Sequence, residues 1–184
     1  VMGFGLLFLG LDLLKNVMSF DASQVSFLTS FNDKGVLGLI IGLFAGGIIT
    51  ALLHSSSAST AIILTMSHQG LLSWEFAAAM VLGSNIGSTV DAIMASWGTK
   101  TNAKRAALVH VMFNVIGTVI AMFFLKPFLA IVDFIIPGPI VGNEPTHIAM
   151  LHTLFNVVNT LIFMPFVNPL ARLTEKLIKP NDDE

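Results

Sequence analysis

The 184-residue sequence contains no cysteine and few charged side chains. The absence of cysteine excludes disulfide bonds, thiolate zinc sites and cysteine nucleophiles, and it removes the usual guide to the redox compartment. Asp, Glu, Lys and Arg make up 11% of the residues, whereas soluble domains carry about 25%. Apolar residues make up 54% and the mean hydropathy is +0.83, so we expect an all-α integral membrane protein. The net charge of −2 argues against a nucleic-acid partner.

A block of hydroxyl side chains interrupts the apolar pattern at residues 50–60, which read TALLHSSSAST. The apolar arms on either side are too short, or only marginally long enough, to span a bilayer alone, since a crossing needs about 20 residues. We therefore predict a re-entrant helical hairpin over residues 36–70, with the serine block at its tip near the membrane middle. The second arm is expected to begin near Ser57, with Ser57 or Ser59 as its N-cap. Such a helix N-terminus attracts anions; the alternative is a polar kink in an ordinary membrane helix.

The next apolar segment, residues 74–97, is bracketed by two tryptophans, which favour the headgroup level. Its middle reads GSNIGST over residues 83–89 and is followed by Asp91. We predict a helix broken at membrane depth; the alternative is an intact helix with small residues for packing. A carboxylate in a span is costly unless it is paired, so Asp91 either helps to bind sodium or pairs with a histidine or lysine elsewhere.

The remaining spans are predicted at residues 1–20, 106–125 and 147–168, and a polar tail at 181–184. Positive charges over residues 100–105 and 172–179 place both segments, and the C-terminus, on the cytoplasmic side. The turn near Gly138, and both ends of the hairpin, then lie outside. The chain begins at Val1 without a basic segment before its first apolar run, so we expect an excised or processed chain and not one that starts with a signal peptide.

Two further patterns bear on packing and on the site. Glycines recur every four residues in the first arm, at Gly38, Gly42 and Gly46, which makes a smooth face for close helix contact and suits a tight hairpin. A His-x-x-x-Asn pair occurs in each of the last two spans, and it either clamps these spans together or contacts ion or substrate. The pairs are His110 with Asn114 and His152 with Asn156.

Catalytic alternatives have little support in the sequence. His54 precedes Ser55, but adjacent residues rarely form a nucleophile–base pair and no third orienting group is visible. His110 and His152 lack a third ligand at metal spacing. We therefore do not expect an enzyme.

Three ordered blocks resemble the signature of the sodium-dependent phosphate cotransporter family, the type II proteins and their bacterial relatives. They are HSSSAST at residues 54–60, GSNIGST at residues 83–89 and HVMFN at residues 110–114. His54 stands where the family has glutamine, Ser88 where it has threonine, and Asp91 where threonine is common. The resemblance implies one copy of an inverted repeat, here the C-terminal one. The second copy would come from the same longer protein or from a homodimer partner.

The resemblance also implies sodium-coupled secondary transport of inorganic phosphate across the cell membrane, with sodium as coupling ion and no other cofactor. A non-transporting membrane subunit of the same fold, or a sodium-coupled transporter of another small anion, are the alternatives. The expected substrate- and ion-binding residues are His54, Ser55, Ser56, Ser57, Ser59, Thr60, Asn85, Ser88, Thr89, Asp91, Asn114 and Asn156. The expected sodium ligands among them are Ser55, Ser56, Asn85, Ser88, Thr89 and Asp91.

Overall fold

The structure is a computed structural model that describes residues 25–180 continuously, together with residues 2, 3, 5, 6, 9, 10, 13 and 23. Its regular elements are all helical over these residues, and four helical segments are long and apolar enough to cross a membrane. These segments are Gly35–Leu53, Trp74–Ser96, Thr101–Phe123 and Glu144–Leu177. The prediction of an all-α membrane protein is therefore confirmed at this level. The predicted span over residues 1–20 and the tail at 181–184 lie outside the continuously described residues.

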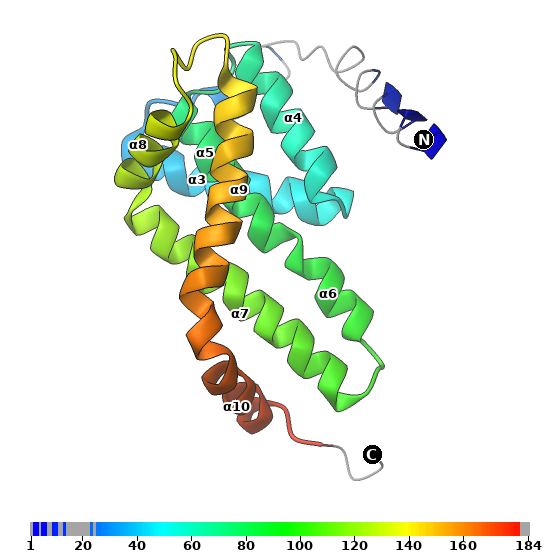
Figure 1. Ribbon diagram of the computed structural model, residues 1–184. Helices are drawn as coiled ribbons and strands as arrows, with labels where there is room; N and C mark the ends of the chain where they lie inside the picture. The colour runs from blue at the N-terminus through cyan, green and yellow to red at the C-terminus, as the bar shows by residue number, and fades with distance from the viewer. Residues whose placement is uncertain are drawn as a thin grey trace.

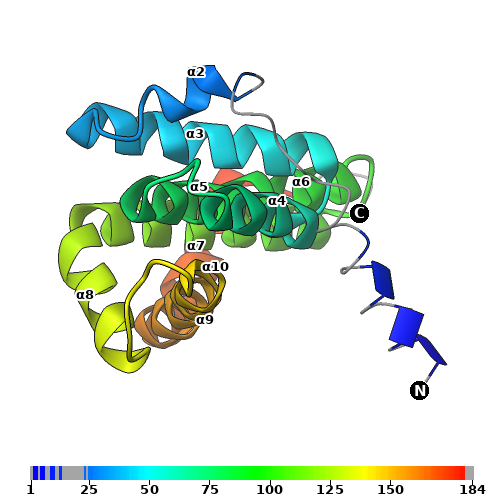
Figure 2. The ribbon, with the colours of Figure 1, turned by 90° about the horizontal axis from the view of Figure 1, so that it is seen from above.

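The elements follow one another along the chain as a series of helices joined by short turns (Figure 1). They are α2 (Ser26–Thr29), α3 (Gly35–Leu53), α4 (Ser56–His68), α5 (Trp74–Gly87), α6 (Thr89–Ser96), α7 (Thr101–Phe123), α8 (Leu125–Ile135), α9 (Glu144–Phe163), the 3-10 turn η1 (Met164–Phe166) and α10 (Val167–Leu177). Seen from above, α3 lies along one side of the molecule, α9 lies toward the other side, and α5 lies between them (Figure 2). The central position of α5 explains why most of its residues are buried.

Helices α3 and α4 form two antiparallel arms that meet at a tight turn. α3 ends at His54, whose backbone is left-handed with φ of 51°, and Ser55 in extended conformation begins α4. At the open end, the Asn32 side chain before α3 donates to the carbonyl of Leu71 after α4 at 2.8 Å. The expected turn in the serine block is therefore present. The cap is Ser55, however, and not Ser57 or Ser59, because the chain reverses within two residues.

Helix α3 packs against α5 and runs in the same direction. Near its beginning Gly42 lies against Phe76, and near its end Thr50 lies against Gly87. Two of the three predicted glycines, Gly42 and Gly46, therefore face α5 and not the other arm of the hairpin, while Gly38 lies against Phe31, before α3. Periodicity alone indicates that a helix face is smooth, but it does not identify the helix that packs on it.

The register of this packing places the turn between α3 and α4 beside Asp91, close to the beginning of α6. Asp91 lies 17 residues after Trp74, which corresponds to about 25 Å along the helix at 1.5 Å per residue. The whole segment Trp74–Ser96 has 23 residues and is about 34 Å long. The turn of the hairpin therefore lies short of the C-terminal end of the segment Trp74–Ser96. α4 has only 13 residues, whereas α3 with 19 is long enough to count as a candidate span.

The interruption between α5 and α6 is limited to Ser88. Its backbone stays in the right-handed helical region, with φ of −65° and ψ of −18°, and its N–H still donates to the Ser84 carbonyl. We predicted a break within residues 83–89, and the structure interrupts the helix at one residue of this block, Ser88. Small residues in this block serve instead the close approach of α3, as Gly83 shows by its contact with Leu43.

The last helices agree in order with the predicted spans but differ in their ends. α7 begins at Thr101, five residues before the expected start at 106, and so takes in part of the basic segment. α9 is followed by a 3-10 turn that contains Pro165, and the amphipathic exit is α10. Arg105 donates from Nε and Nη2 to the carbonyl of Ile178, at 3.1 and 3.0 Å. The two basic segments therefore lie at one end of the molecule, and the connection between α8 and α9, residues 136–143, lies at the other (Figure 1).

Replacing Gly46 with alanine is expected to push α3 away from α5, because the added methyl group would overlap the Met80 carbonyl. We expect a loss of about 1–3 kcal/mol, as for overpacked cores, measured as a lower midpoint of thermal unfolding in detergent. Gly47→Ala is the matched control: its methyl group would lie 3.3 Å from the Gly83 carbonyl oxygen, and alanine's better helix propensity offsets the crowding. Equal losses for both variants would contradict the packing described.

Candidate functional site

The turn between α3 and α4 exposes the N-terminus of a 13-residue helix. Ser55 caps this helix: its Oγ accepts a hydrogen bond from the Ala58 N–H at 3.2 Å. The N–H groups of Ser56 and Ser57 have no acceptor within the helix, as in the first turn of any helix. Ser57 is exposed and Ser56 is half-buried. The turn therefore presents backbone donors, hydroxyl groups and the positive end of a helix dipole at one place.

Two hydroxyls farther along the hairpin lie on its inner side. Thr50 on α3 donates its hydroxyl hydrogen to Ser59 Oγ on α4 at 2.7 Å, and both residues are fully buried. Thr60, the next residue, has a buried Oγ1 without a hydrogen-bond partner. Ser59 thus joins the two arms, and Thr60 is a member of the predicted set whose buried hydroxyl has no hydrogen-bond partner. Thr50 was not predicted, although it stands at the start of the polar block.

His54 and Asp91 meet at the turn. His54 Nδ1 lies 2.6 Å from Asp91 Oδ1, and the two side chains are 50% and 46% exposed. A carboxylate only accepts, so the imidazole donates this bond. Of the two sequence hypotheses for Asp91, pairing with a histidine is therefore realised, while Oδ2 remains available for another partner.

The other predicted cation ligands lie on α5 and at the beginning of α6. Ser88 Oγ donates to the Asn85 carbonyl at 2.8 Å, and Thr89 Oγ1 donates to the Ile86 carbonyl at 2.7 Å. Donation uses the hydroxyl hydrogen of each side chain and leaves oxygen lone pairs for a cation or a second donor. Asn85 and Thr89 are buried and Ser88 is half-buried. These oxygens lie within little more than one helical turn, from Asn85 to Thr89.

His152 of α9 reaches this segment from the opposite side. Its Nε2 lies 3.2 Å from Asn85 Oδ1. The sequence repeat that contains His152 was recognised, but His152 itself was not among the predicted site residues. Because Asn85 lies on α5, His152 joins α9 to α5 and not to α7.

The two asparagines of the repeat have no hydrogen bond to the turn. Asn114 donates to the His110 carbonyl at 3.0 Å, and Asn156 donates to the His152 carbonyl at 2.8 Å. Each amide group therefore bonds to its own helix. Their predicted part in binding receives no direct geometric support from these bonds.

The clamp expected between the last two spans is made by Asn159, which the repeat does not include. Asn159 Nδ2 donates to the Phe113 carbonyl of α7 at 3.2 Å, and its amide group fills the space above Gly117. The sequence feature that could have identified Asn159 is Gly117 on α7, because only glycine at position 117 leaves room for the Asn159 amide group. Among the described residues no three His, Cys, Asp or Glu side chains are grouped closely enough to hold a metal ion.

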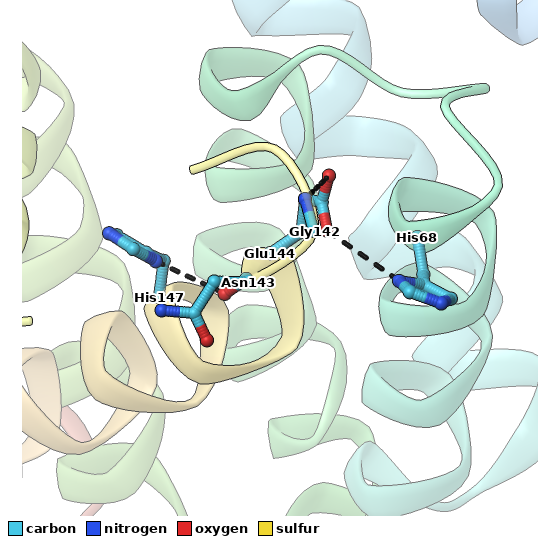
Figure 3. A network of polar contacts seen from close by, with 5 residues as sticks. All are labelled: His68, Gly142, Asn143, Glu144 and His147. Carbon is cyan, nitrogen blue, oxygen red and sulfur yellow. Dashed lines mark hydrogen bonds and ion pairs between the residues drawn. The ribbon is translucent and has the colours of Figure 1, made fainter. Parts of the chain in front are cut away.

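A second polar network lies at the open end of the hairpin, far along α4 from the turn (Figure 3). Glu144 at the beginning of α9 accepts from the Gly142 N–H at 2.9 Å, and its other oxygen lies 3.6 Å from His68 Nδ1. His147 is fully buried and its Nδ1 lies 3.1 Å from the Asn143 carbonyl oxygen. The contact between Glu144 and His68 joins the C-terminal end of α4 to the beginning of α9.

Residues 20–136 match the protein family described as Na+/Pi-cotransporter. This range includes the α3–α4 hairpin, α5, α6 and α7. A relative from Bacillus subtilis, the uncharacterized protein YqeW, is 35% identical over 108 residues. The sodium-dependent phosphate transport protein 2A of Rattus norvegicus is 34% identical over 131 residues. The putative inorganic phosphate export protein YjbB of Salmonella typhimurium is 29% identical over 135 residues.

These alignments cover 59%, 66% and 71% of this chain, respectively. They cover 34%, 20% and 24% of the three relatives. The chain therefore corresponds to about a third or less of each relative. No solved structure matches it.

Replacing Thr50 with valine is expected to destabilise the hairpin, because it leaves the Ser59 hydroxyl buried without its partner. The expected loss is about 1 kcal/mol, given the modest strength of interhelical hydrogen bonds in membranes. Thermal unfolding of the purified protein measures it. The double variant T50V/S59A should recover most of the loss because no polar group is then left unpaired. A double variant less stable than T50V would contradict this assignment.

Proposed function

Because this chain belongs to the Na+/Pi-cotransporter family, we propose that it takes part in sodium-coupled secondary transport of inorganic phosphate. The observation that carries the proposal is the meeting of an open helix N-terminus with a carboxylate. The turn at Ser55 presents donors suited to an anion, and Asp91, whose side chain reaches this turn, supplies oxygens suited to a cation. One place thus offers both chemistries that coupled transport of an anion and a cation requires.

Phosphate would bind at the beginning of α4. Its oxygens would accept from the free N–H groups of Ser56 and Ser57 and from the hydroxyls of Ser55, Ser56 and Ser57, and the helix dipole would favour its charge. Thr60, with an unpartnered hydroxyl, would extend this set by one turn. His54 and Ser59 would shape the site: His54 from the turn, and Ser59 by fixing the two arms together.

Sodium would bind between the turn and the α5–α6 junction. Small hard cations prefer oxygen ligands, and the chain offers the hydroxyls of Ser88 and Thr89, the amide oxygen of Asn85 and the carboxylate oxygens of Asp91. Ser55 and Ser56 would complete the set from the turn. Asn114 and Asn156 stay in the proposal only as residues that approach when a second repeat closes over the site.

In the membrane, α3 and α4 would form a re-entrant hairpin, since the turn lies beside Asp91 about 25 Å along a helical segment of about 34 Å. The basic end, with Arg105 bonded to Ile178, would face the cytoplasm of a cell-membrane protein together with the C-terminus. The half-exposed His54–Asp91 pair would lie on a surface that a second, inverted repeat covers. That repeat would come from the same longer protein or from a second copy of the chain.

Two other functions differ in what they bind. A non-transporting subunit of the same fold would bind neither phosphate nor sodium. A transporter of another small anion, such as a carboxylate, would use the same helix N-terminus with a different fit. The turn carries both hydroxyl groups and backbone N–H donors. This combination favours a tetrahedral oxyanion, which accepts several hydrogen bonds at once.

The proposal is tested by uptake of labelled phosphate into proteoliposomes that contain the purified protein, with an inward sodium gradient and with potassium in its place. We expect uptake only with sodium, and a fall of about tenfold or more when Ser55, Ser56 and Ser57 are all changed to alanine, since several charge-assisted hydrogen bonds are lost. Excess carboxylate should not compete with phosphate.

The matched control is Thr65→Ala, which removes a hydroxyl from the same helix where it bonds only to the Ala61 carbonyl, at 2.9 Å. Uptake by this variant should stay within about a factor of two, because the change leaves no group unpaired at the turn. Sodium-independent uptake, or equal activity of the triple variant and wild type, would remove the proposed function.

A further inference from the structure

The backbone at the hairpin turn is held in an unfavourable conformation by a side-chain contact. Among the described residues, His54 is the one non-glycine with positive φ, at 51°. A side chain in the left-handed region costs on the order of 1 kcal/mol, so other contacts must compensate for it. The compensating contact is the 2.6 Å hydrogen bond from His54 Nδ1 to Asp91 Oδ1. The shape of the turn thus depends on a partner located on α6.

This contact joins the two elements that would bind the two solutes. His54 is followed directly by the Ser55 cap of α4, and Asp91 stands three residues after the interruption at Ser88. In the part of the chain from residue 25 to residue 180, His54 is the ion-pair partner of Asp91. Any change in the contacts of Asp91 therefore acts on the residue that orients the beginning of α4.

A cation at Asp91 and the His54 N–H cannot use Oδ1 in the same way. The N–H points its positive end at the carboxylate oxygen, so a cation bound to that oxygen would lie against it. With both side chains about half exposed, there is room for the imidazole to turn away. The left-handed backbone at His54 would then lose its compensation, and the turn would be free to move.

We propose that His54 and the coupling cation compete for Asp91, so that cation binding releases the hairpin turn from α6. The proposal rests on the proposed function, because it takes sodium as the cation. His54 is in this sense a positioning residue: it holds the empty turn in place and gives up its partner when the cation arrives.

The competition predicts that removing the His54 side chain strengthens cation binding, whereas loss of a residue that only supports the site would weaken it. If His54 only braced the site, its removal would weaken cation binding or leave it unchanged. If it competes, its removal strengthens cation binding. His54→Gly is the suitable variant, because glycine adopts the left-handed conformation without cost and the change does not strain the turn.

The experiment titrates the thermal stability of the purified full chain with sodium chloride, at one pH and with choline chloride holding the ionic strength constant. Ligands that bind the folded state raise its stability, so the midpoint shift reports the sodium half-saturation concentration without transport. We expect His54→Gly to lower this concentration about threefold or more, a change in the range of couplings between residues in contact. Asp91→Asn should raise it about tenfold, because the charge is lost from a ligand.

The decisive comparison is the double variant H54G/D91N. With the contested carboxylate absent, removing His54 should no longer strengthen sodium binding, and the double variant should match Asp91→Asn within a factor of about two. His68→Ala, at the far end of α4 beside Glu144, is the matched control and should keep the wild-type half-saturation concentration. His54→Asn serves as a second variant: asparagine also tolerates the left-handed region, but its amide N–H can still donate to Asp91, so this variant should bind sodium less tightly than His54→Gly.

Unchanged or weaker sodium binding in His54→Gly, or equal binding in His54→Gly and His54→Asn, would overturn the competition and leave sodium-coupled transport standing. The competition is also overturned if His54→Gly tightens binding equally in the Asp91→Asn background. A wild-type protein that sodium stabilises no better than choline removes the proposed function itself, and the competition with it.

Discussion

The close contact between α3 and α5 decides where everything else at the turn lies. Gly46 fits against the Met80 carbonyl and Gly83 against Leu43, so the two backbones approach without intervening side chains. Because the helices run in the same direction in this register, the end of α3 arrives beside the beginning of α6. A bulkier residue at these positions would shift or separate the helices and carry the turn away from Asp91. The arrangement of the site thus depends on van der Waals contact between glycine faces, the usual source of helix association in membranes.

From this register follow the chemical properties of the turn. The chain reverses at His54 and Ser55, which exposes the beginning of α4, and the same reversal directs His54 to Asp91. On the other side of α5, His152 contacts Asn85 and so links α9 to the segment from Asn85 to Thr89. The polar groups of three elements therefore act on one short segment around Ser88. A solute bound there would be in contact with helices whose other ends are fixed elsewhere, for α4 by the contact between His68 and Glu144.

Local features of the chain were predictable from the sequence, and the choice of partners was not. The turn in the serine block, the glycine that ends α4 and the amphipathic exit follow from local rules; Gly70 indeed has a positive φ of 72°. The glycine face of α3 was recognised, but its partner is α5, because two surfaces of similar smoothness compete for it. The break near residues 83–89 was overestimated because glycines that serve helix contact look like glycines that interrupt a helix. Asn159 was missed since its significance depends on Gly117, 42 positions earlier in the chain.

The placement of the turn beside α6 is the central claim, and cross-linking in the membrane tests it most directly. The chain has no cysteine, so cysteines introduced in place of His54 and Asp91 would be the ones available to a short bifunctional thiol reagent. The account predicts an intramolecular cross-link for this pair and none for cysteines at His68 and Asp91, because α4 carries His68 about 20 Å away from the turn at 1.5 Å per residue. No cross-link between positions 54 and 91, or equal cross-linking of positions 68 and 91, would contradict the account.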